Sequence, residues 1–243
     1  MLIVQKYGGT SVADADCIRR AACRLAEAAR QGNSVVAVVS AQGDLTDRLL
    51  EKIASVAEKP SWRESDACVS AGEQISAALV AMAVEEQGCS AVSLTGWQAG
   101  LVTDACYGNA KIRFLQGERI RTELDRGRVV VVAGFQGIDR NDNITTLGRG
   151  GSDTTAVALA AFLRADKCQI FTDVEGIYDK DPRKHPDAKK YSHMSYDRVL
   201  HLCNQGAQVL HKPCVELAKQ CHILLEVRSA FTEAEGTVVG ALE

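Results

Sequence analysis

The stretch TTLGRGGSDTT at residues 145–155 places three glycines, one cation and one carboxylate immediately before a long apolar segment. Glycine lets the backbone approach a ligand closely, and free N–H groups at a helix N-terminus attract anions. The Arg149 guanidinium can hold a carboxylate or a phosphate through two parallel hydrogen bonds. Asp153 can orient a lysine or hold Mg²⁺. The stretch therefore predicts a phosphoryl-transfer site at the start of a buried helix.

Short apolar runs alternate with helical patterns on both sides of this stretch. Runs of β-branched residues, such as residues 34–40, are typical of strands that are covered on both faces. The predicted strands are residues 2–6, 34–40, 91–94, 128–133, 168–172 and 222–227. The predicted helices are residues 14–31, 65–87, 112–125, 152–165, 196–204 and 208–220. This alternation predicts an α/β fold with a mostly parallel central sheet and helices on both faces.

Composition and charge narrow the function classes. The chain has 243 residues, of which 46% are hydrophobic and 24% charged, and its net charge is −3. These values are typical of a globular protein and give no basic surface for nucleic acid. No apolar run approaches the roughly 20 residues of a membrane span, and residues 1–6 enter a strand pattern without the features of a secretory signal. We expect no nucleic-acid partner, no membrane association and a cytoplasmic location.

The cysteine and histidine residues give no catalytic or metal signature. The nine cysteines are odd in number and no two have Cys-x-x-Cys spacing, which favours free thiols in a reducing compartment. Cys214, Cys221 and His222 could form a metal cluster, but zinc-site spacing is absent and packing roles are favoured. No histidine neighbours a serine or cysteine nucleophile, so no triad is predicted and His211 is interpreted as structural.

The loop KYGGTS at residues 6–11 follows the first predicted strand. Adjacent glycines after a buried strand can form a backbone nest for phosphate oxygens, and Lys6 would project from the strand end as a point charge. An ordinary Gly-Gly turn with a surface lysine explains the same pattern. Because ligands bind at the carboxyl ends of parallel strands, we expect this loop and the loops after Ser40 and Ala133 to share one site.

Three further segments have both a functional and a structural interpretation. SAQGDLTD at residues 40–47 provides hydroxyl groups and a glycine, or a helix-capping loop. Glu73 lies in an otherwise apolar helical pattern, where it binds substrate, faces solvent or pairs with a lysine. FTDVEGIYDKDPR at residues 171–183 offers Tyr178 to an adenine ring and Arg183 to a phosphate, or forms an acidic turn with a packing tyrosine.

Together these segments resemble the aspartate kinase branch of the amino acid kinase family. The matching segments occur in order over nearly the whole chain, and the combination of KYGGTS with LGRGGSDTTA resembles aspartate kinases in particular. They are KYGGTS at 6–11, SAQGDLTD at 40–47, SAGEQIS at 70–76, SLTGWQAG at 93–100, VVAGFQG at 131–137, TTLGRGGSDTTAVALAA at 145–161, FTDVEGIYDKDPR at 171–183, GAQVLH at 206–211 and LEVRS at 225–229.

The resemblance implies a three-layer α/β/α sandwich, with the amino acid bound toward the N-terminal half and ATP bound by residues from about 140 to 243. It implies Mg-ATP-dependent phosphorylation of the L-aspartate side chain to 4-phospho-L-aspartate, the entry step to lysine, threonine and methionine. Lys6 would stabilise the transferring phosphoryl group, and Asp153 would organise that lysine. Aspartate would be held by Ser40, Thr46, Glu73, Arg149 and Ser152. The nucleotide would be contacted by Gly8, Gly9, Ser11, Thr172, Asp173, Tyr178 and Arg183.

The chemistry of the reaction agrees with these roles. An aspartate side chain, with a pKa of about 3.9, is already ionised at neutral pH, so no general base is needed. The site must bring two anions together, which calls for cations, Mg²⁺ and oriented N–H donors. Glu73 suits the substrate ammonium, and Arg149 suits its α-carboxylate.

The resemblance also sets expectations about organisation. Residues 1–243 are expected to form a single kinase domain without the regulatory ACT domains of typical relatives. Family members are commonly dimers through this domain, so a homodimer is expected, and regulation would require a separate chain. Two alternatives stay open: a kinase of the same fold that acts on an aspartate analogue, and a non-catalytic member that binds ligands.

Overall fold

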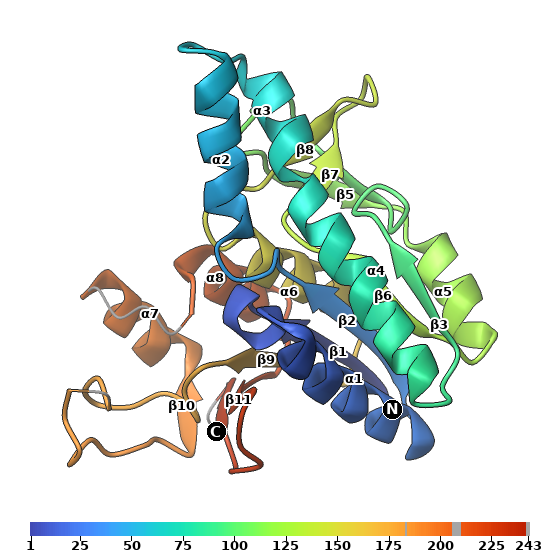
Figure 1. The fold of residues 1–243 in the computed structure, drawn as a ribbon. Coiled ribbons are helices and arrows are strands. Elements are labelled where there is room, and N and C mark those ends of the chain that lie inside the picture. The colour runs from blue at the N-terminus through green and yellow to red at the C-terminus, as the bar shows by residue number, and fades with distance from the viewer. Residues whose placement is uncertain (183, 206–209, 242–243) are drawn as a thin grey trace.

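The central feature of the molecule is an eight-stranded sheet (Figure 1). The computed structural model describes residues 1–182, 184–205 and 210–241. In spatial order the strands are β10 (His193–Ser195), β12 (Thr237–Gly240), β11 (Leu225–Ser229), β9 (Lys167–Thr172), β1 (Leu2–Tyr7), β2 (Ser34–Val39), β6 (Val129–Ala133) and β3 (Ala91–Leu94). The six strands from β11 to β3 are mutually parallel, whereas β12 runs antiparallel to β11. The expected mostly parallel sheet is confirmed.

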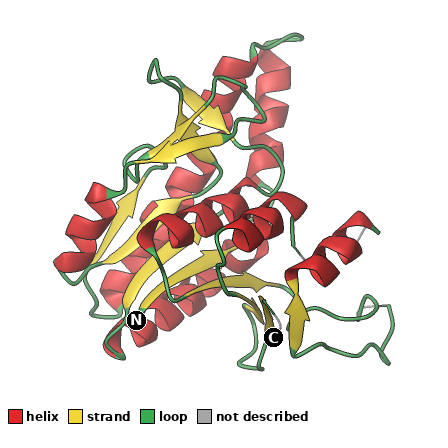
Figure 2. Ribbon diagram, turned by 180° about the vertical axis from the view of Figure 1, so that it is seen from behind, coloured by secondary structure: helices red, strands yellow, loops and turns green. Residues whose placement is uncertain are grey.

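Helices cover both faces of this sheet, which gives the expected three layers (Figures 1 and 2). Alternate residues of β2 divide between two cores, because successive strand side chains point to opposite faces. Val35, Ala37 and Val39 pack with α1 (Ala15–Arg30) and α4 (Ala71–Glu86). Val36 and Val38 face the other core. Helices α5 (Glu118–Asp125), α6 (Gly151–Leu163), α7 (Tyr196–Asn204) and α8 (Lys212–Gln220) contribute to that second core.

A smaller substructure stands at one end of the molecule (Figure 1). It contains a four-stranded sheet and two helices that follow β2 in the chain. Its strands are, in spatial order, β5 (Ile112–Leu115), β4 (Leu101–Thr103), β7 (Gln136–Ile138) and β8 (Ile144–Thr146). Its helices are α2 (Leu45–Val56) and α3 (Trp62–Val69). The sequence patterns did not predict β4, β7 or β8, since each of these strands has only three residues. The amphipathic pattern of α2 was missed.

Three predicted elements have different boundaries. The single helix over residues 65–87 is wrong, since α3 and α4 are separated at Ser70, whose carbonyl accepts a 2.8 Å hydrogen bond from Gln136 Nε2 instead of continuing one ladder. The helix over residues 112–125 is wrong in its first turn, because Leu115 pairs with Leu101 and forms β5. The last predicted strand begins at Leu225, since residues 222–223 close α8. The predicted start of helix 208–220 lies outside the described residues.

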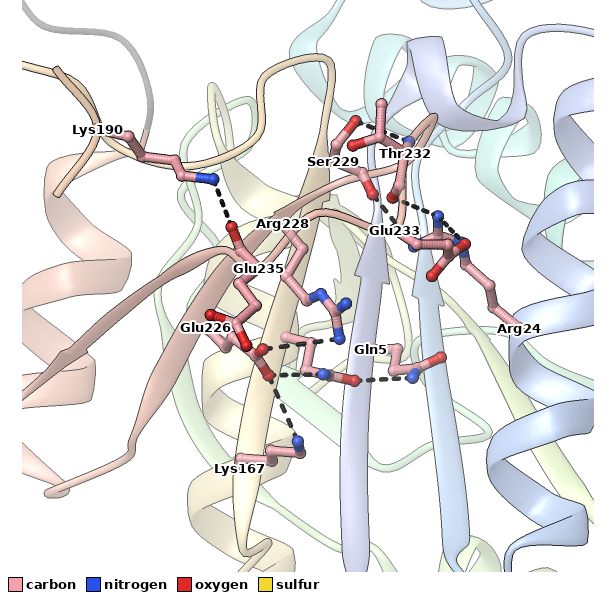
Figure 3. A network of polar contacts seen from close by, with 11 residues as sticks. Gln5, Arg24, Lys167, Lys190, Glu226, Arg228, Ser229, Thr232, Glu233 and Glu235 are labelled. Atoms are coloured by element: carbon pink, nitrogen blue, oxygen red, sulfur yellow. Dashed lines mark hydrogen bonds and ion pairs between the residues drawn. The ribbon is translucent and has the colours of Figure 1, made fainter. Parts of the chain in front are cut away.

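Polar side chains line the face of the sheet beside α1 (Figure 3). Gln5 Nε2 donates to Gln169 Oε1 at 2.8 Å, and Gln169 Nε2 donates to Glu226 Oε2 at 2.6 Å. Lys167 Nζ donates to the same Glu226 oxygen at 3.4 Å. The chain of bonds joins β1, β9 and β11 side by side where apolar packing against α1 ends.

Within the described residues, one segment is long and apolar enough to cross a membrane by length and composition alone. It runs over Trp62–Glu86 and thus combines α3 with α4. The expectation that no apolar run reaches this length is therefore wrong. Half of its most apolar window is buried inside the fold, as is usual for a core helix.

Candidate active site

Lys6 and Asp153 form an ion pair at the carboxyl edge of the sheet. Lys6 lies near the end of β1, and Asp153 lies in the first turn of α6, where a carboxylate interacts favourably with the helix dipole. Lys6 Nζ lies 2.6 Å from Asp153 Oδ1, and their side chains are only 13% and 7% exposed. The pair places a largely desolvated ammonium at the end of a central strand, with Asp153 fixing its position.

A pocket of about 230 Å³ opens next to this ion pair. All of the residues predicted for catalysis or for binding aspartate line it, although they come from four separate segments of the chain. They are Lys6, Ser40, Thr46, Glu73, Arg149, Ser152 and Asp153. Their convergence agrees with the rule that ligands bind outside the carboxyl ends of parallel strands.

Glu73 supplies a buried carboxylate on one side of the pocket. It lies in the first turn of α4 and is 4% exposed, so the interpretation as a solvent-facing residue is wrong. Its Oε1 accepts a 3.1 Å hydrogen bond from the backbone N–H of Ala41, and its Oε2 has no hydrogen-bond partner among the described residues. Burial raises the pKa of the Glu73 carboxyl to about 7, and the hydrogen bond from Ala41 opposes part of that shift. An arriving cation would satisfy the free oxygen.

The glycine-rich loop brings Arg149 to the wall of the same pocket. Arg149 is exposed, and it lies between Gly148 and Gly150, which have φ values of +72° and +75°. A Cβ atom at Gly150 would lie 2.2 Å from Cγ of His211, so the close approach to that ring also requires glycine. The loop then enters α6, where the Gly151 N–H donates to the Gly148 carbonyl at 3.0 Å. The N-terminal turn that follows is of the kind that binds anions.

Two pocket residues were missed or misread from the sequence. Phe135 lines the pocket at a φ of 71°, which is rare for an aromatic residue and occurs most often at functional sites. Its backbone is held on both sides, because its N–H donates to Thr155 Oγ1 and its carbonyl accepts from Leu147. His211 also lines the pocket, beyond the structural role expected for it. The glycine before Phe135 was the available signal for the first. The segment GAQVLH at residues 206–211 contained the second but did not indicate that it lines the pocket.

The residues predicted to contact a nucleotide lie at the ends of β1 and β9. A Cβ atom at Gly8 would lie 3.4 Å from Lys6 Nζ, and one at Gly9 would lie 2.8 Å from the Ala41 carbonyl. Ser11 is buried, and its hydroxyl donates to the Phe171 carbonyl at 3.5 Å. The loop therefore lies close to Lys6 and to the Ala41 backbone, and at Gly9 there is no room for a side chain.

The second group of predicted nucleotide contacts follows β9 and does not line the pocket. Thr172 Oγ1 donates to Asp173 Oδ1 at 3.1 Å. Tyr178 pairs with Lys190 in an isolated bridge, and burial together with the neighbouring Glu175 raises the pKa of the Tyr178 hydroxyl. Arg183 lies outside the described residues. Thr172, Asp173 and Tyr178 are thus not among the residues that line the pocket.

Comparison with known proteins assigns the family. A model of the amino acid kinase family matches residues 1–229. The chain belongs to the amino acid kinase family. This amino acid kinase domain is 51% identical to the aspartokinase of Bacillus sp. strain MGA3 and 52% identical to that of Geobacillus stearothermophilus, over 98% of its length. It spans 58% of the length of each of these relatives.

Solved structures of other family members share the same fold. The amino acid kinase domain superposes on aspartate kinase from Synechocystis with a TM-score of 0.89 at 44% identity, over all of this chain and 40% of the other. E. coli aspartokinase III in complex with aspartate and ADP gives a TM-score of 0.88 at 29% identity, over all of this chain and 65% of the other. The UMP kinase of Bacillus anthracis, at 17% identity and a TM-score of 0.70, shares the fold alone.

Proposed function

We propose that this chain transfers the γ-phosphoryl group of Mg-ATP to the side-chain carboxylate of L-aspartate and forms 4-phospho-L-aspartate. The observation that carries the proposal is the arrangement of charges around one pocket. Glu73 offers a buried carboxylate oxygen without a partner, Arg149 offers a guanidinium, and the Lys6–Asp153 pair lies beside both. A zwitterion with a second carboxylate matches this arrangement better than a plain diacid does. The named aspartokinases among its relatives support the same substrate.

Each group has a role that follows from its position. Glu73 accepts the substrate ammonium, Arg149 holds the α-carboxylate, and the hydroxyl groups of Ser40, Thr46 and Ser152 complete the binding. The side-chain carboxylate of the substrate attacks directly, because it is ionised at neutral pH. Lys6 and the N-terminus of α6 stabilise the negative charge that spreads over the moving phosphoryl group. Asp153 keeps the Lys6 ammonium directed to that position.

The nucleotide would lie along the loops at the ends of β1 and β9. The solved complex of E. coli aspartokinase III with aspartate and ADP supports the proposal that this chain binds both kinds of ligand. We assign the phosphates to Gly8, Gly9 and Ser11, and the remainder of the nucleotide to Thr172, Asp173, Tyr178 and Arg183. The described residues contain no group of three His, Cys, Asp or Glu side chains that could hold a metal. Mg²⁺ favours phosphate oxygens and water, so it would be bound through ATP.

A panel assay tests the proposal. ADP release is measured with L-aspartate, L-glutamate, N-acetylglutamate, carbamate and UMP under the same conditions. Turnover with aspartate alone is expected. Turnover with another acceptor would assign that acceptor as the substrate in place of aspartate. Binding of aspartate or ATP without ADP release would favour a non-catalytic member of the family. Three expectations stay predictions: a homodimer, a separate regulatory chain and a cytoplasmic location. Light scattering of the purified chain tests the first.

A further inference from the structure

Asp66 is a buried carboxylate that the proposed reaction does not use. It lies in α3 and is only 2% exposed. Its Oδ2 accepts from the backbone N–H of Thr146 at 2.8 Å, and its Oδ1 accepts from the Thr146 hydroxyl at 2.7 Å. The backbone N–H of Gly108 donates to both oxygens, at 2.9 and 3.1 Å. Hydrogen bonds to an ionised acceptor are about twice as strong as neutral ones, so Asp66 fastens two backbone segments firmly.

One of these segments leads directly to Arg149. Thr146 ends β8 three residues before Arg149. The other segment, which contains Gly108, contacts the same loop, since the Ala110 N–H donates to the Thr146 carbonyl at 2.8 Å. A Cβ atom at Gly148 would lie 3.1 Å from the Gly108 carbonyl oxygen, so the two segments are in direct contact. Asp66 thus anchors both strands of backbone on which the Arg149 loop rests.

The other end of the connection leads to Glu73. Ser70 N–H donates to the Asp66 carbonyl at 3.1 Å, and α4 begins at the next residue and carries Glu73 in its first turn. Gln136 Nε2 donates to the Ser70 carbonyl at 2.8 Å and fixes the junction between the two helices. Asp66 and Glu73 therefore lie on two successive helices that meet at Ser70, whereas Arg149 belongs to the loop that Asp66 binds.

We propose that Asp66 is a positioning residue that sets the separation between Glu73 and Arg149, the two groups assigned to the ammonium and α-carboxylate of aspartate. This inference rests on the proposed function. Arg149 is exposed and flanked by glycines, so its own loop restrains it weakly. Without the Asp66 carboxylate, two backbone N–H groups and one hydroxyl lose their buried acceptor, and the loop samples other positions. Substrate binding must then order the loop again, which weakens the affinity for aspartate.

Asp66→Asn tests this role, and Asp139→Asn is a matched control. Asp139 is also 2% exposed and accepts backbone N–H groups from Asn141 at 2.8 Å and Asn143 at 3.0 Å in the turn between β7 and β8. It contacts the segment next to Gly108 through the Tyr107 hydroxyl at 3.0 Å and through no backbone N–H group that the structure describes there. We expect Asp66→Asn to raise KM for aspartate by about tenfold or more, with KM for ATP and kcat within about threefold of the parent values. Asp139→Asn is expected to leave KM for aspartate unchanged. Equal KM values for both variants and the parent would overturn the proposal.

Limited proteolysis gives a second measurement that does not depend on substrate. Trypsin cleavage after Arg149, located by mass spectrometry, is expected to accelerate about tenfold in Asp66→Asn and to stay at the parent rate in Asp139→Asn. Unchanged cleavage after Arg149 in Asp66→Asn would show that the carboxylate does not hold the loop. If the parent chain shows no turnover with aspartate, the proposed function fails, while proteolysis still decides whether Asp66 restrains Arg149. Should Asp66→Asn not fold, Thr146→Val removes only the hydroxyl bond and is expected to change both measurements in the same direction.

Discussion

The Lys6 ammonium lies 2.6 Å from an oxygen of the Asp153 carboxylate, and both side chains are largely buried. The two residues are 147 positions apart in the chain, but β1 and the first turn of α6 bring them to the same edge of the sheet. A desolvated ammonium interacts with a developing negative charge much more strongly than a hydrated one does. Asp153 therefore has two effects on Lys6. It compensates the charge of the buried ammonium, and it holds that ammonium at the wall of the pocket.

Lys6→Met is expected to lower kcat with aspartate by at least about 100-fold, because the variant removes the cation that we propose faces the transferring phosphoryl group. The variant also leaves Asp153 buried without its cation, so a lower melting temperature is expected. Steady-state ADP release and thermal unfolding measure the two effects. Lys167→Met is the control, since Lys167 lies on β9 in the ion pair with Glu226, outside the pocket. Unchanged turnover in Lys6→Met would contradict the mechanism.

Glu73→Gln is expected to raise KM for aspartate by about tenfold or more, because an amide cannot neutralise the substrate ammonium. KM for ATP is expected to change little. The variant should be at least as stable as the parent at pH 8, since it removes a buried charge with one unpartnered oxygen. An intact affinity for aspartate would assign the ammonium to another residue.

The pKa of Glu73, raised to about 7, predicts a pH dependence of aspartate binding. Only the ionised carboxylate accepts the ammonium, so KM for aspartate should rise by about tenfold for each pH unit below 7. Measurements of KM between pH 5.5 and 8.5 check this slope. In Glu73→Gln the slope over this range should be absent, because the titrating group has been removed.

The same shift predicts how Glu73 affects stability. The folded state keeps the proton up to about pH 7, whereas the unfolded chain loses it near 4.5, so the burial penalty grows as the pH rises between these values. The melting temperature of Glu73→Gln relative to the parent should therefore increase from pH 5 to pH 8. A constant difference across this range would show that the buried group does not titrate as expected.

A positive φ costs an alanine about 1–2 kcal/mol, and Gly150→Ala is expected to lower the free energy of unfolding by more than this. Its new Cβ atom would lie 2.2 Å from Cγ of His211 and displace that side chain from the pocket. Gly127→Ala is a close control, because Gly127 has the same φ of +75° and no atom within 4 Å of the added Cβ. Chemical denaturation of both variants separates backbone strain from the clash. Equal losses would mean that His211 moves aside freely.

Much of the central sheet was predictable from local patterns. The continuous apolar runs at residues 34–39 and 129–133, rich in β-branched residues, are typical of strands with two covered faces, and the structure confirms this interpretation. The smaller substructure was not predictable in the same way. Residues 112–115 have no strand pattern, and only their pairing with β4 decides their conformation.

The candidate site divides along the same line. The motifs around Lys6 and Arg149 were visible in the sequence, because glycines and charges beside apolar segments mark positions where a backbone meets a ligand. Glu73 was visible as a charge in an otherwise apolar helical pattern. The burial of Glu73, the entry of His211 into the pocket and the bonds of Asp66 to Thr146 were not visible.

The sequence by itself determined the periodicity of the elements and the chemical groups at the strand ends, since both depend on neighbouring residues. Only the tertiary structure decided which of these groups meet and how far each is removed from water. Contacts between distant segments and the local dielectric depend on how the layers pack, and no short stretch of sequence encodes them.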